Sequence, residues 1–172
     1  MEEIFLKARN GDELAFEELV NSLKPNLYKI AYIKLNNSNA VNDVLQDTFI
    51  SLYVNIKKIK LPDRVLFWIT KVLLNNCKKY WKNNKKELSY DELEAEKYIS
   101  NTNDYEKIES NHDIELILKT LTDEEKNIII LYYIGEYTSK DIAKLLHINE
   151  STVRSKIKRS IEKIRKGGNY ER

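Results

Sequence analysis

The chain has 172 residues, a length that allows one domain or two small ones and excludes a large multi-domain protein. Hydrophobic residues make up 42% of the sequence and charged residues 33%, so the chain can bury a core and wholesale disorder is not expected. The single cysteine, Cys77, excludes an internal disulfide framework and a cysteine-based metal cluster.

With four glycines and two prolines, the sequence lacks the dense turn signals of a fold built from many short strands. We therefore expect an all-α protein. The first ten residues lack a basic segment followed by an apolar one, and no stretch approaches the roughly 18 to 20 apolar residues of a membrane span. We expect a cytoplasmic protein that is neither exported nor inserted into a membrane.

The net charge is only +2, but the charges are separated along the chain. Residues 57–86 carry ten bases and one acid, residues 87–115 ten acids and two bases, and residues 140–166 nine bases and three acids. Solvated helix faces account for any one such run taken alone. Two positive segments joined by a negative one instead suggest two contacts with one polyanion, because phosphate neutralisation supplies most of the non-specific affinity for DNA.

Apolar residues spaced three and four apart predict helices on both sides of the acidic run. We expect a helical domain over residues 1–86, an acidic linker over 87–111 and a second helical domain over 112–172. In the first domain the apolar stripes begin at Leu14, Val41 and Leu66. Pro25 is expected to break or kink the first helix, and Ser38 or Asn39 to cap the second.

The second domain opens with a capping box, in which Thr122 is followed three residues later by Glu125. An apolar run over residues 128–134 then ends at Gly135, the expected C-terminal cap. These signals predict two further short helical segments before the last pair of helices.

Residues 138–154 carry a helix-turn-helix pattern, in which small Ala143 allows two helices to cross closely. Val153 and Ile157 begin the core face of the second helix, so its other face is left for base edges and phosphates. The expected DNA-binding side chains are Ser151, Thr152, Arg154, Ser155, Lys158 and Arg159. His147 is expected to be a strained turn residue rather than a ligand. A plain antiparallel helix pair is the alternative.

The two halves together resemble a known family. Residues 11–19, 40–49 and 67–75 are similar to region 2 of bacterial sigma factors of the extracytoplasmic-function (ECF) type, and residues 118–121, 128–133 and the helix-turn-helix are similar to region 4. The resemblance implies two small helical domains, the second helix-turn-helix and winged-helix-like. It also implies a non-enzymatic subunit without cofactor or metal, which binds core RNA polymerase and promoter DNA. The Asn-, Lys- and Ile-rich composition is typical of an AT-rich genome, such as a clostridial one.

The resemblance also assigns residues. Asp43, Gln46 and Asp47 match the family's surface for the clamp helices of the polymerase largest subunit. Asn75 matches an asparagine near the minus-ten DNA, and residues 57–64 match a loop around a flipped base. The implied minus-ten set is Lys57, Lys58, Lys60, Arg64, Lys71, Asn75, Lys78, Lys79 and Lys82. The helix-turn-helix set given above is implied to bind the minus-35 element.

The chain departs from the family pattern at two positions. Lys79 and Lys82 stand where the family often has Asp and Arg, so the resemblance does not imply which minus-ten bases are bound. Trp68 is expected in the core, whereas Trp81 is equally compatible with the core and with DNA. A separate anti-sigma protein is a further partner that the resemblance allows.

Two other functions compete with this interpretation. A self-sufficient helix-turn-helix regulator would form a dimer on a palindrome, which the mass in solution would reveal. An enzyme would need a convergent catalytic set, and the sequence has no Gly-rich phosphate loop and no cluster of metal ligands.

Overall fold

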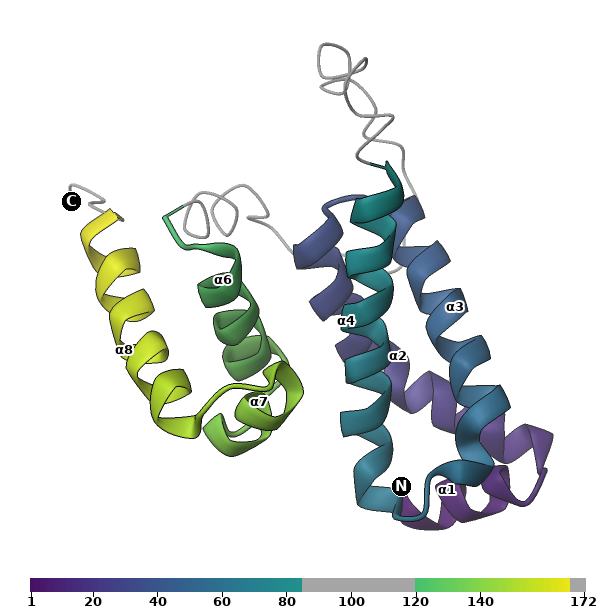
Figure 1. Ribbon diagram of the computed structural model, residues 1–172. Coiled ribbons are helices and arrows are strands. Elements are labelled where there is room, and N and C mark those ends of the chain that lie inside the picture. Colours follow the sequence, from purple (N-terminus) through teal and green to yellow (C-terminus); the bar gives the residue numbers. More distant parts are fainter. Residues whose placement is uncertain (85–119, 168–172) are drawn as a thin grey trace.

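The computed structural model describes residues 1–84 and 120–167, which form two groups of helices (Figure 1). These two ranges contain no β-strand. The all-α expectation is therefore confirmed for this part of the chain. The predicted acidic linker, residues 87–111, lies outside the described residues. We call residues 1–84 the N-terminal module and residues 120–167 the C-terminal module.

The N-terminal module packs its helices around one apolar core. Its elements are α1 (Glu2–Arg9), α2 (Glu13–Leu35), α3 (Ser38–Asn55), the short 3-10 turns η1 (Ile56–Lys58) and η2 (Pro62–Arg64), and α4 (Val65–Asn84). Helices α2, α3 and α4 contact one another along their lengths, because each presents a stripe of buried aliphatic side chains at helical spacing. Leu19, Leu27 and Leu73 are among the side chains that this packing buries completely.

Two details of α2 differ from the sequence expectation. The helix runs through Pro25, so a break at this residue is wrong. An interior proline costs a helix about 3 kcal/mol, and burial of Leu23 and Leu27 on either side offsets this at roughly 1.5 to 3 kcal/mol each. Leu14 is 79% exposed, because it lies in the first turn, before the buried stripe begins.

The cap of α3 also differs. Asn37, rather than Ser38 or Asn39, is the N-cap, and its side-chain oxygen accepts a hydrogen bond from the Ala40 backbone N–H at 3.0 Å. The shift has a local cause: Asn36 ends α2 in the left-handed conformation at φ 47°, and Asn37 is then extended. The chain thus reverses one residue earlier than expected.

The C-terminal module contains α6 (Asp123–Ile129), a π-helical segment η3 (Ile130–Ile134), α7 (Ser139–Leu146) and α8 (Glu150–Gly167). Ile128, Leu131, Ile142 and Val153 form the centre of its core. Thr122 and Glu125 make the expected capping box at the start of α6. The predicted helix-turn-helix is α7, the turn at residues 147–149 and α8.

Three residues near the turns are constrained, one by the space around it and two by a left-handed backbone. Gly135 follows η3 as expected, but its backbone is right-handed and Glu136 takes the left-handed conformation, at φ 56°. Glycine is needed at 135 for space, since a Cβ there would lie 2.8 Å from the Tyr137 ring and 2.9 Å from the Leu131 carbonyl oxygen. His147 ends α7 at φ 56°, as expected for a strained turn residue.

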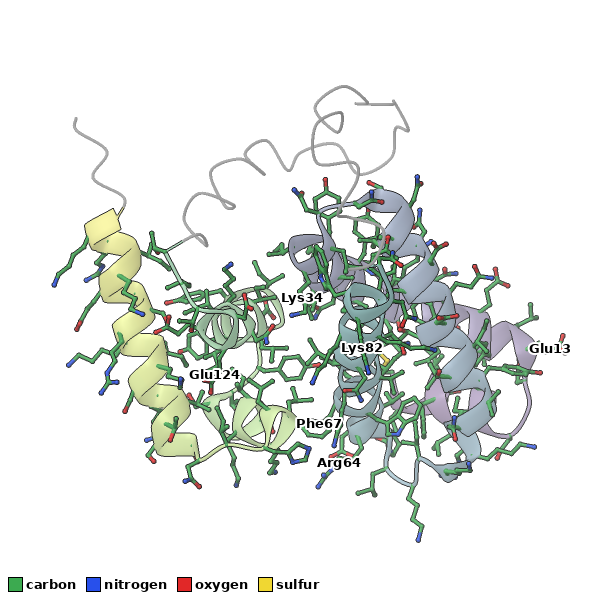
Figure 2. All side chains as sticks on the ribbon, turned by 45° about the horizontal axis from the view of Figure 1, so that its top comes forward. Glu13, Lys34, Arg64, Phe67, Lys82 and Glu124 are labelled. Atoms are coloured by element: carbon green, nitrogen blue, oxygen red, sulfur yellow. The ribbon has the colours of Figure 1, made fainter. Side chains whose placement is uncertain are left out.

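The two modules contact each other. Helix α7 packs against α4, and η3 packs against α2. In both views α8 lies on the side of the C-terminal module that faces away from α4 (Figures 1 and 2). Within residues 1–84 and 120–167, no helix is both long enough and apolar enough to span a bilayer.

Candidate nucleic-acid interface

The expected DNA-reading side chains lie on one exposed face of α8. Val153, Ile157 and Ser160 are buried against the rest of the module. Ser151, Arg154, Ser155, Lys158 and Arg159 are exposed, and Thr152 is partly buried. Spacings of three and four residues place the exposed set along one stripe of the helix. This stripe carries three cations.

The N-terminal end of this stripe borders a hollow of about 570 Å³ between the starts of α7 and α8. Arg154 reaches back to Glu150 there, with 2.5 Å between the guanidinium Nη2 and the carboxylate Oε1. Lys140 and Ser139 line the opposite side. Thr138 fixes the start of α7, because its hydroxyl accepts a hydrogen bond from the Asp141 backbone N–H at 3.2 Å.

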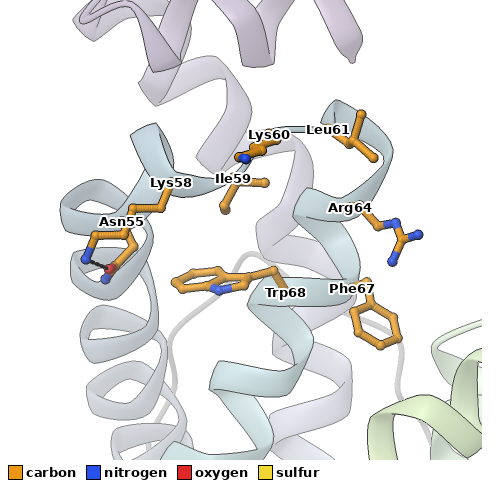
Figure 3. Close-up of a pocket in the computed structure, with 8 residues that line it drawn as sticks. All are labelled: Asn55, Lys58, Ile59, Lys60, Leu61, Arg64, Phe67 and Trp68. Atoms are coloured by element: carbon orange, nitrogen blue, oxygen red, sulfur yellow. Dashed lines mark hydrogen bonds between the residues drawn. The ribbon is translucent and has the colours of Figure 1, made fainter.

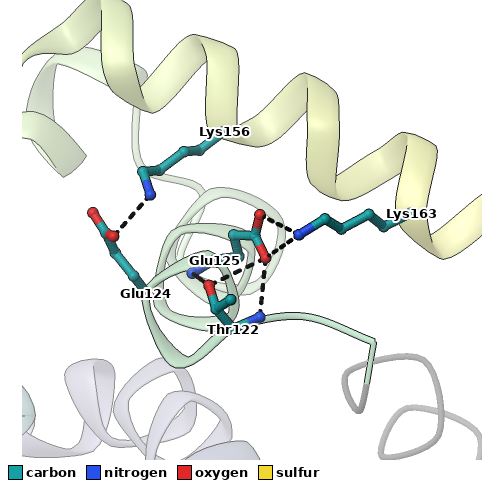
Figure 4. Close-up of polar contacts among 5 residues, drawn as sticks. All are labelled: Thr122, Glu124, Glu125, Lys156 and Lys163. Carbon is teal, nitrogen blue, oxygen red and sulfur yellow. Dashed lines mark hydrogen bonds and ion pairs between the residues drawn. The ribbon is translucent and has the colours of Figure 1, made fainter.

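A charged cluster holds α8 against α6 (Figure 4). Lys163 donates to both carboxylate oxygens of Glu125, at 2.7 and 2.8 Å, and Lys156 donates to Glu124 at 2.8 Å. The Thr122 backbone N–H donates to the Glu125 carboxylate at 2.9 Å. The Lys163 ammonium and the Thr122 N–H lower the pKa of Glu125 to about 2. This cluster fixes the orientation of the stripe on α8.

The N-terminal module has its own hollow, of about 360 Å³, where the loop after α3 meets the start of α4 (Figure 3). Trp68 and Phe67 supply aromatic surface on α4, and Asn55 supplies an amide at the end of α3. The remaining lining residues are Lys58, Ile59, Lys60, Leu61 and Arg64. Cations around an aromatic surface match the chemistry of single-stranded nucleic acid, whose bases stack while its phosphates are neutralised.

Hydrogen bonds fix the walls of this hollow. Lys58 donates to the Asn55 side-chain oxygen at 2.9 Å, and Asn55 donates to the Ser51 carbonyl at 2.9 Å. Arg9 of α1 donates to the Lys60 carbonyl at 3.2 Å. The structure thus brings the loop cations Lys58, Lys60 and Arg64 together at one opening.

The other expected minus-ten residues follow α4. Asn75, Lys78, Lys79 and Lys82 are exposed on this helix, and Lys57 is exposed in the loop before it. Lys71 differs from them, because it is partly buried and its ammonium lies 3.1 Å from His147 Nε2 of the C-terminal module.

The two tryptophans differ. Trp68 packs partly against the N-terminal core and also lines the hollow. Trp81 is 39% exposed, and its indole N–H donates to the Lys34 carbonyl at 3.3 Å. Trp68 thus has both a structural contact and a face on the candidate base site.

A third surface lies on α3. Asp43, Gln46 and Asp47 are exposed, whereas Val44 and Leu45 between them are buried. The same face of the helix continues to three exposed apolar side chains, Ile50, Tyr53 and Val54. This face of α3 therefore has a polar part followed by an exposed apolar part.

Family comparisons decide the class of protein. The model of Sigma-70 region 2 matches residues 19–87, and that of Sigma-70, region 4 matches residues 117–166. The chain belongs to the sigma-70 family. Among its relatives, the ECF RNA polymerase sigma factor SigW of Bacillus subtilis (strain 168) is 24% identical over 173 residues, covering 93% of this chain and 92% of that protein. Bacteriocin UviA of Clostridium perfringens is 27% identical over 154 residues, covering 80% and 82% respectively.

Solved structures share the fold of this sigma factor. The structure of CnrH in complex with the cytosolic domain of CnrY has a TM-score of 0.73 at 19% identity and covers 99% of this chain and 98% of that one. The sigma factor RpoE in complex with the anti-sigma factor NepR from Bartonella quintana has a TM-score of 0.71 at 16% identity, covering 91% and 98%. These structures show the same fold, and the region 2 and region 4 matches, with an ECF sigma factor among the relatives, confirm the ECF-type resemblance.

The region 2 match contains α3, α4 and the hollow between them, and the region 4 match contains the helix-turn-helix. Sequence reasoning missed the apolar residues Ile50, Tyr53 and Val54 of this sigma factor as a surface. Tyr53 belongs by its spacing to the apolar stripe that begins at Val41, yet it is 62% exposed, and its ring lies edge-on against Phe16. The sequence holds one signal of this surface. Ile50 and Val54 are apolar residues that follow Asp43 and Asp47 at steps of three and four, and so lie on the same face of the helix.

Proposed function

We propose a division of labour for this sigma factor, which binds core RNA polymerase and directs it to promoters. The surface on α3 binds the polymerase. The hollow, together with α4, binds the minus-ten DNA, and the stripe on α8 binds the minus-35 element. The observation that carries the proposal is the presence of region 2 and region 4 matches on one chain, each with an exposed cationic surface.

At the minus-ten element, the hollow takes an unstacked base. Trp68 and Phe67 offer faces for stacking. Beyond its bonds to Ser51 and Lys58, the Asn55 amide keeps a second N–H and a second oxygen lone pair for a base edge. Unstacking a base costs a few kcal/mol, which such contacts offset. The cations of the minus-ten set neutralise the phosphates of the separated strand, and Asn75 contacts the same strand along α4.

At the minus-35 element, α8 enters the major groove. Arg154 is the proposed base reader, because a guanidinium pairs with two acceptors of guanine and because it lies near the N-terminal end of the helix. Lys158 and Arg159 lie further along the stripe and neutralise phosphates. Ser151, Thr152 and Ser155 complete the proposed contact surface.

The polymerase surface of α3 combines two kinds of contact. Asp43, Gln46 and Asp47 form the polar rim, which we assign to contact with the polymerase clamp. Ile50 and Val54 supply apolar area that leaves water when the partner binds, and a few such residues carry most of the affinity of an interface.

Two further proposals follow from the family. The protein acts in the cytoplasm, where RNA polymerase transcribes. A separate anti-sigma protein regulates it, by analogy with the Bartonella quintana sigma factor RpoE, which forms a complex with the anti-sigma factor NepR.

Run-off transcription tests the function. The purified chain and core RNA polymerase are incubated with a library of AT-rich upstream regions, and start sites are mapped with and without the chain. The proposal predicts start sites that depend on the chain and share two motifs at a fixed spacing. Absence of such sites, together with a dimeric mass in gel filtration, would instead support a self-sufficient regulator.

A further inference from the structure

Helix α1 lies against the loop that forms the wall of the base hollow (Figure 1). It contacts both short turns of this loop, η1 and η2. The region 2 match begins at residue 19, so α1 lies outside the part of the chain that this family model covers. The hollow is therefore supported by an element to which the family match gives no role.

One side chain of α1 bonds to the loop. The Arg9 guanidinium donates to the Lys60 backbone carbonyl at 3.2 Å. It also lies 5.9 Å from the centre of the Phe5 ring, a distance at which a cation is attracted to the face of an aromatic ring. Phe5 has no exposed surface and belongs to the core of the N-terminal module. Arg9 therefore connects the loop to the core.

The bonded carbonyl lies in the middle of the loop, where the backbone is extended. Ile59 and Leu61, on either side of Lys60, have ψ angles of 108° and 125°. The Ile59 N–H is bonded within η1 and the Arg64 N–H within η2, so each turn closes on itself. Neither turn supplies a donor to the Lys60 carbonyl, and Arg9 is its partner.

Fixing this carbonyl fixes residues that line the hollow. Because a peptide group is planar, a bond to the Lys60 carbonyl orients the whole peptide between Lys60 and Leu61. Both residues line the hollow, with Lys58 before them and Arg64 after them (Figure 3). The Lys60 side chain is exposed and has little packing of its own to hold it. The position of the loop cations therefore depends on α1.

Arg9 differs in this respect from the other cation in the last turn of α1. Lys7 is exposed and pairs with Glu3 within the helix, at 2.8 Å. Arg9 is half-buried, and within residues 1–84 and 120–167 it forms no ion pair. Its hydrogen bond therefore serves the loop rather than the helix.

A base site benefits from a loop that is ordered before the base arrives. A segment that the ligand must order costs conformational entropy at the moment of binding, and a preordered segment avoids that cost. A net hydrogen bond of ordinary strength shifts the equilibrium between an ordered and a detached loop by roughly 2- to 12-fold. The Arg9 bond is thus strong enough to change how often the hollow is formed.

We propose that Arg9 is a positioning residue for promoter opening, which holds the backbone of residues 59–61 against α1 so that the hollow is formed before an unstacked minus-ten base enters it. The inference rests on the proposed function of the hollow. It gives α1 a part in opening without a contact between α1 and DNA.

Two variants of Arg9 and one matched control test the proposal. Arg9→Met removes the donor and keeps an unbranched stem, whereas Arg9→Lys keeps the charge and a donor. Lys7→Met is the control, because it makes the same kind of replacement in the same turn of α1 and changes the net charge by the same amount.

Hydrogen exchange in the free full-length chain measures whether the loop is held. We expect the N–H groups of Ile59 and Arg64 to exchange roughly 2- to 12-fold faster in Arg9→Met than in Lys7→Met and the unaltered chain, with Arg9→Lys in between. The N–H of the buried Leu52 in α3 should exchange at the same rate in all of them, which reports that the module is folded. Unchanged exchange at Ile59 and Arg64 in Arg9→Met would overturn the positioning role.

Opening in the polymerase–promoter complex is the second readout. It is followed by permanganate reactivity of unpaired thymines on a promoter selected by run-off transcription. We expect opening at least about twofold slower for Arg9→Met than for Lys7→Met, with most of the rate regained in Arg9→Lys. Affinities for core polymerase and for a minus-35 duplex should stay unchanged, a split that general unfolding would not give. Faster loop exchange with unchanged opening would overturn the link between Arg9 and the base site.

The unaltered chain separates failure of this inference from failure of the proposed function. Promoter opening by the unaltered chain, together with equal opening by Arg9→Met and Lys7→Met, would refute only the role of Arg9. Absence of opening by the unaltered chain with active core polymerase would refute the proposed function, and the inference with it.

Discussion

Glu150 and Arg154 lie one turn apart on α8, with 2.5 Å between their charged groups. An exposed pair of this kind contributes less than about 1 kcal/mol to stability. Its importance is positional, because Glu150 holds the guanidinium at the N-terminal end of the stripe that we assign to the minus-35 element. When DNA binds, the Arg154 guanidinium must either leave the Glu150 carboxylate or contact the DNA while still paired with it.

The first prediction concerns this pair. Arg154→Ala should weaken binding to a selected minus-35 duplex by about 1 to 3 kcal/mol and relax the preference at one base position. Lys158→Ala should weaken binding to all sequences alike and reduce the salt dependence by about one charge. Binding titrations at several salt concentrations measure both effects. Equal sequence-independent losses for the two variants would contradict the assignment of Arg154 as base reader.

The second prediction concerns stability and pH. Because the pKa of Glu125 is about 2 in the folded chain and 4.5 ordinarily, its carboxylate stabilises the C-terminal module above pH 4.5, and this contribution disappears as pH falls through 2. Glu125→Gln should therefore lower the free energy of unfolding by about 1 to 3 kcal/mol at neutral pH.

Thermal unfolding followed by circular dichroism between pH 7 and pH 2 checks this prediction. The difference between the unaltered chain and Glu125→Gln should shrink steadily below pH 4.5. Glu124→Gln is the control, since Glu124 forms a more exposed pair with Lys156 and its loss should cost less than about 0.5 kcal/mol. A difference that stays constant with pH would contradict the role of the charge.

The third prediction separates the two tryptophans and Asn75. Trp68→Ala should impair strand opening at the minus-ten element, with the loss of about 1 to 3 kcal/mol expected for a stacked base, whereas Trp81→Ala should leave opening intact. Asn75→Ala should also impair opening and leave binding to the minus-35 duplex unchanged.

Permanganate reactivity of unpaired thymines in the polymerase–promoter complex reports opening. Because Trp68 also packs on the core, Trp68→Phe is the companion variant, which retains an aromatic face and should retain most of the opening. Loss of opening in Trp68→Phe equal to that in Trp68→Ala would show that the indole acts in some way other than as a stacking surface.

The fourth prediction concerns α3. Ile50→Glu should weaken binding to core polymerase by about 2 kcal/mol or more, as expected for a residue at the centre of an interface. Asp43→Asn, at the polar rim, should have a smaller effect that depends on salt. Glu18→Gln, at an exposed position of α2, serves as control. Equal affinities for Ile50→Glu and the control would exclude the apolar part of this face from the interface.

Much of the fold follows from helical periodicity. Ala15, Leu19, Leu23, Leu27, Ile30 and Ala31 follow one another at steps of three and four, which place them on one face of a helix, and the structure buries all of them. The capping box of Thr122 and the turn at His147 were also predictable, because these local conformations depend on neighbouring residues. Pro25 was not, since long-range packing outweighs the local cost of proline.

The relationship between the modules could not be predicted. The Tyr137 hydroxyl lies 2.6 Å from the Thr70 hydroxyl of α4. Tyr137 follows a glycine by two residues in what resembles an ordinary turn, and nothing near it in the sequence predicts this contact. Ile130 belongs to the apolar run over residues 128–134 of the C-terminal module, yet it is buried in the core of the N-terminal module. Periodicity identifies which face of a helix is buried but not which element covers it.

A specificity subunit of RNA polymerase must bind the core enzyme. Titration of the purified chain into core polymerase lacking a sigma factor, followed by gel filtration, measures this binding. We expect a saturable complex with one chain per core enzyme, weakened by Ile50→Glu. Failure of the chain to co-elute with active core polymerase at any ratio would contradict it.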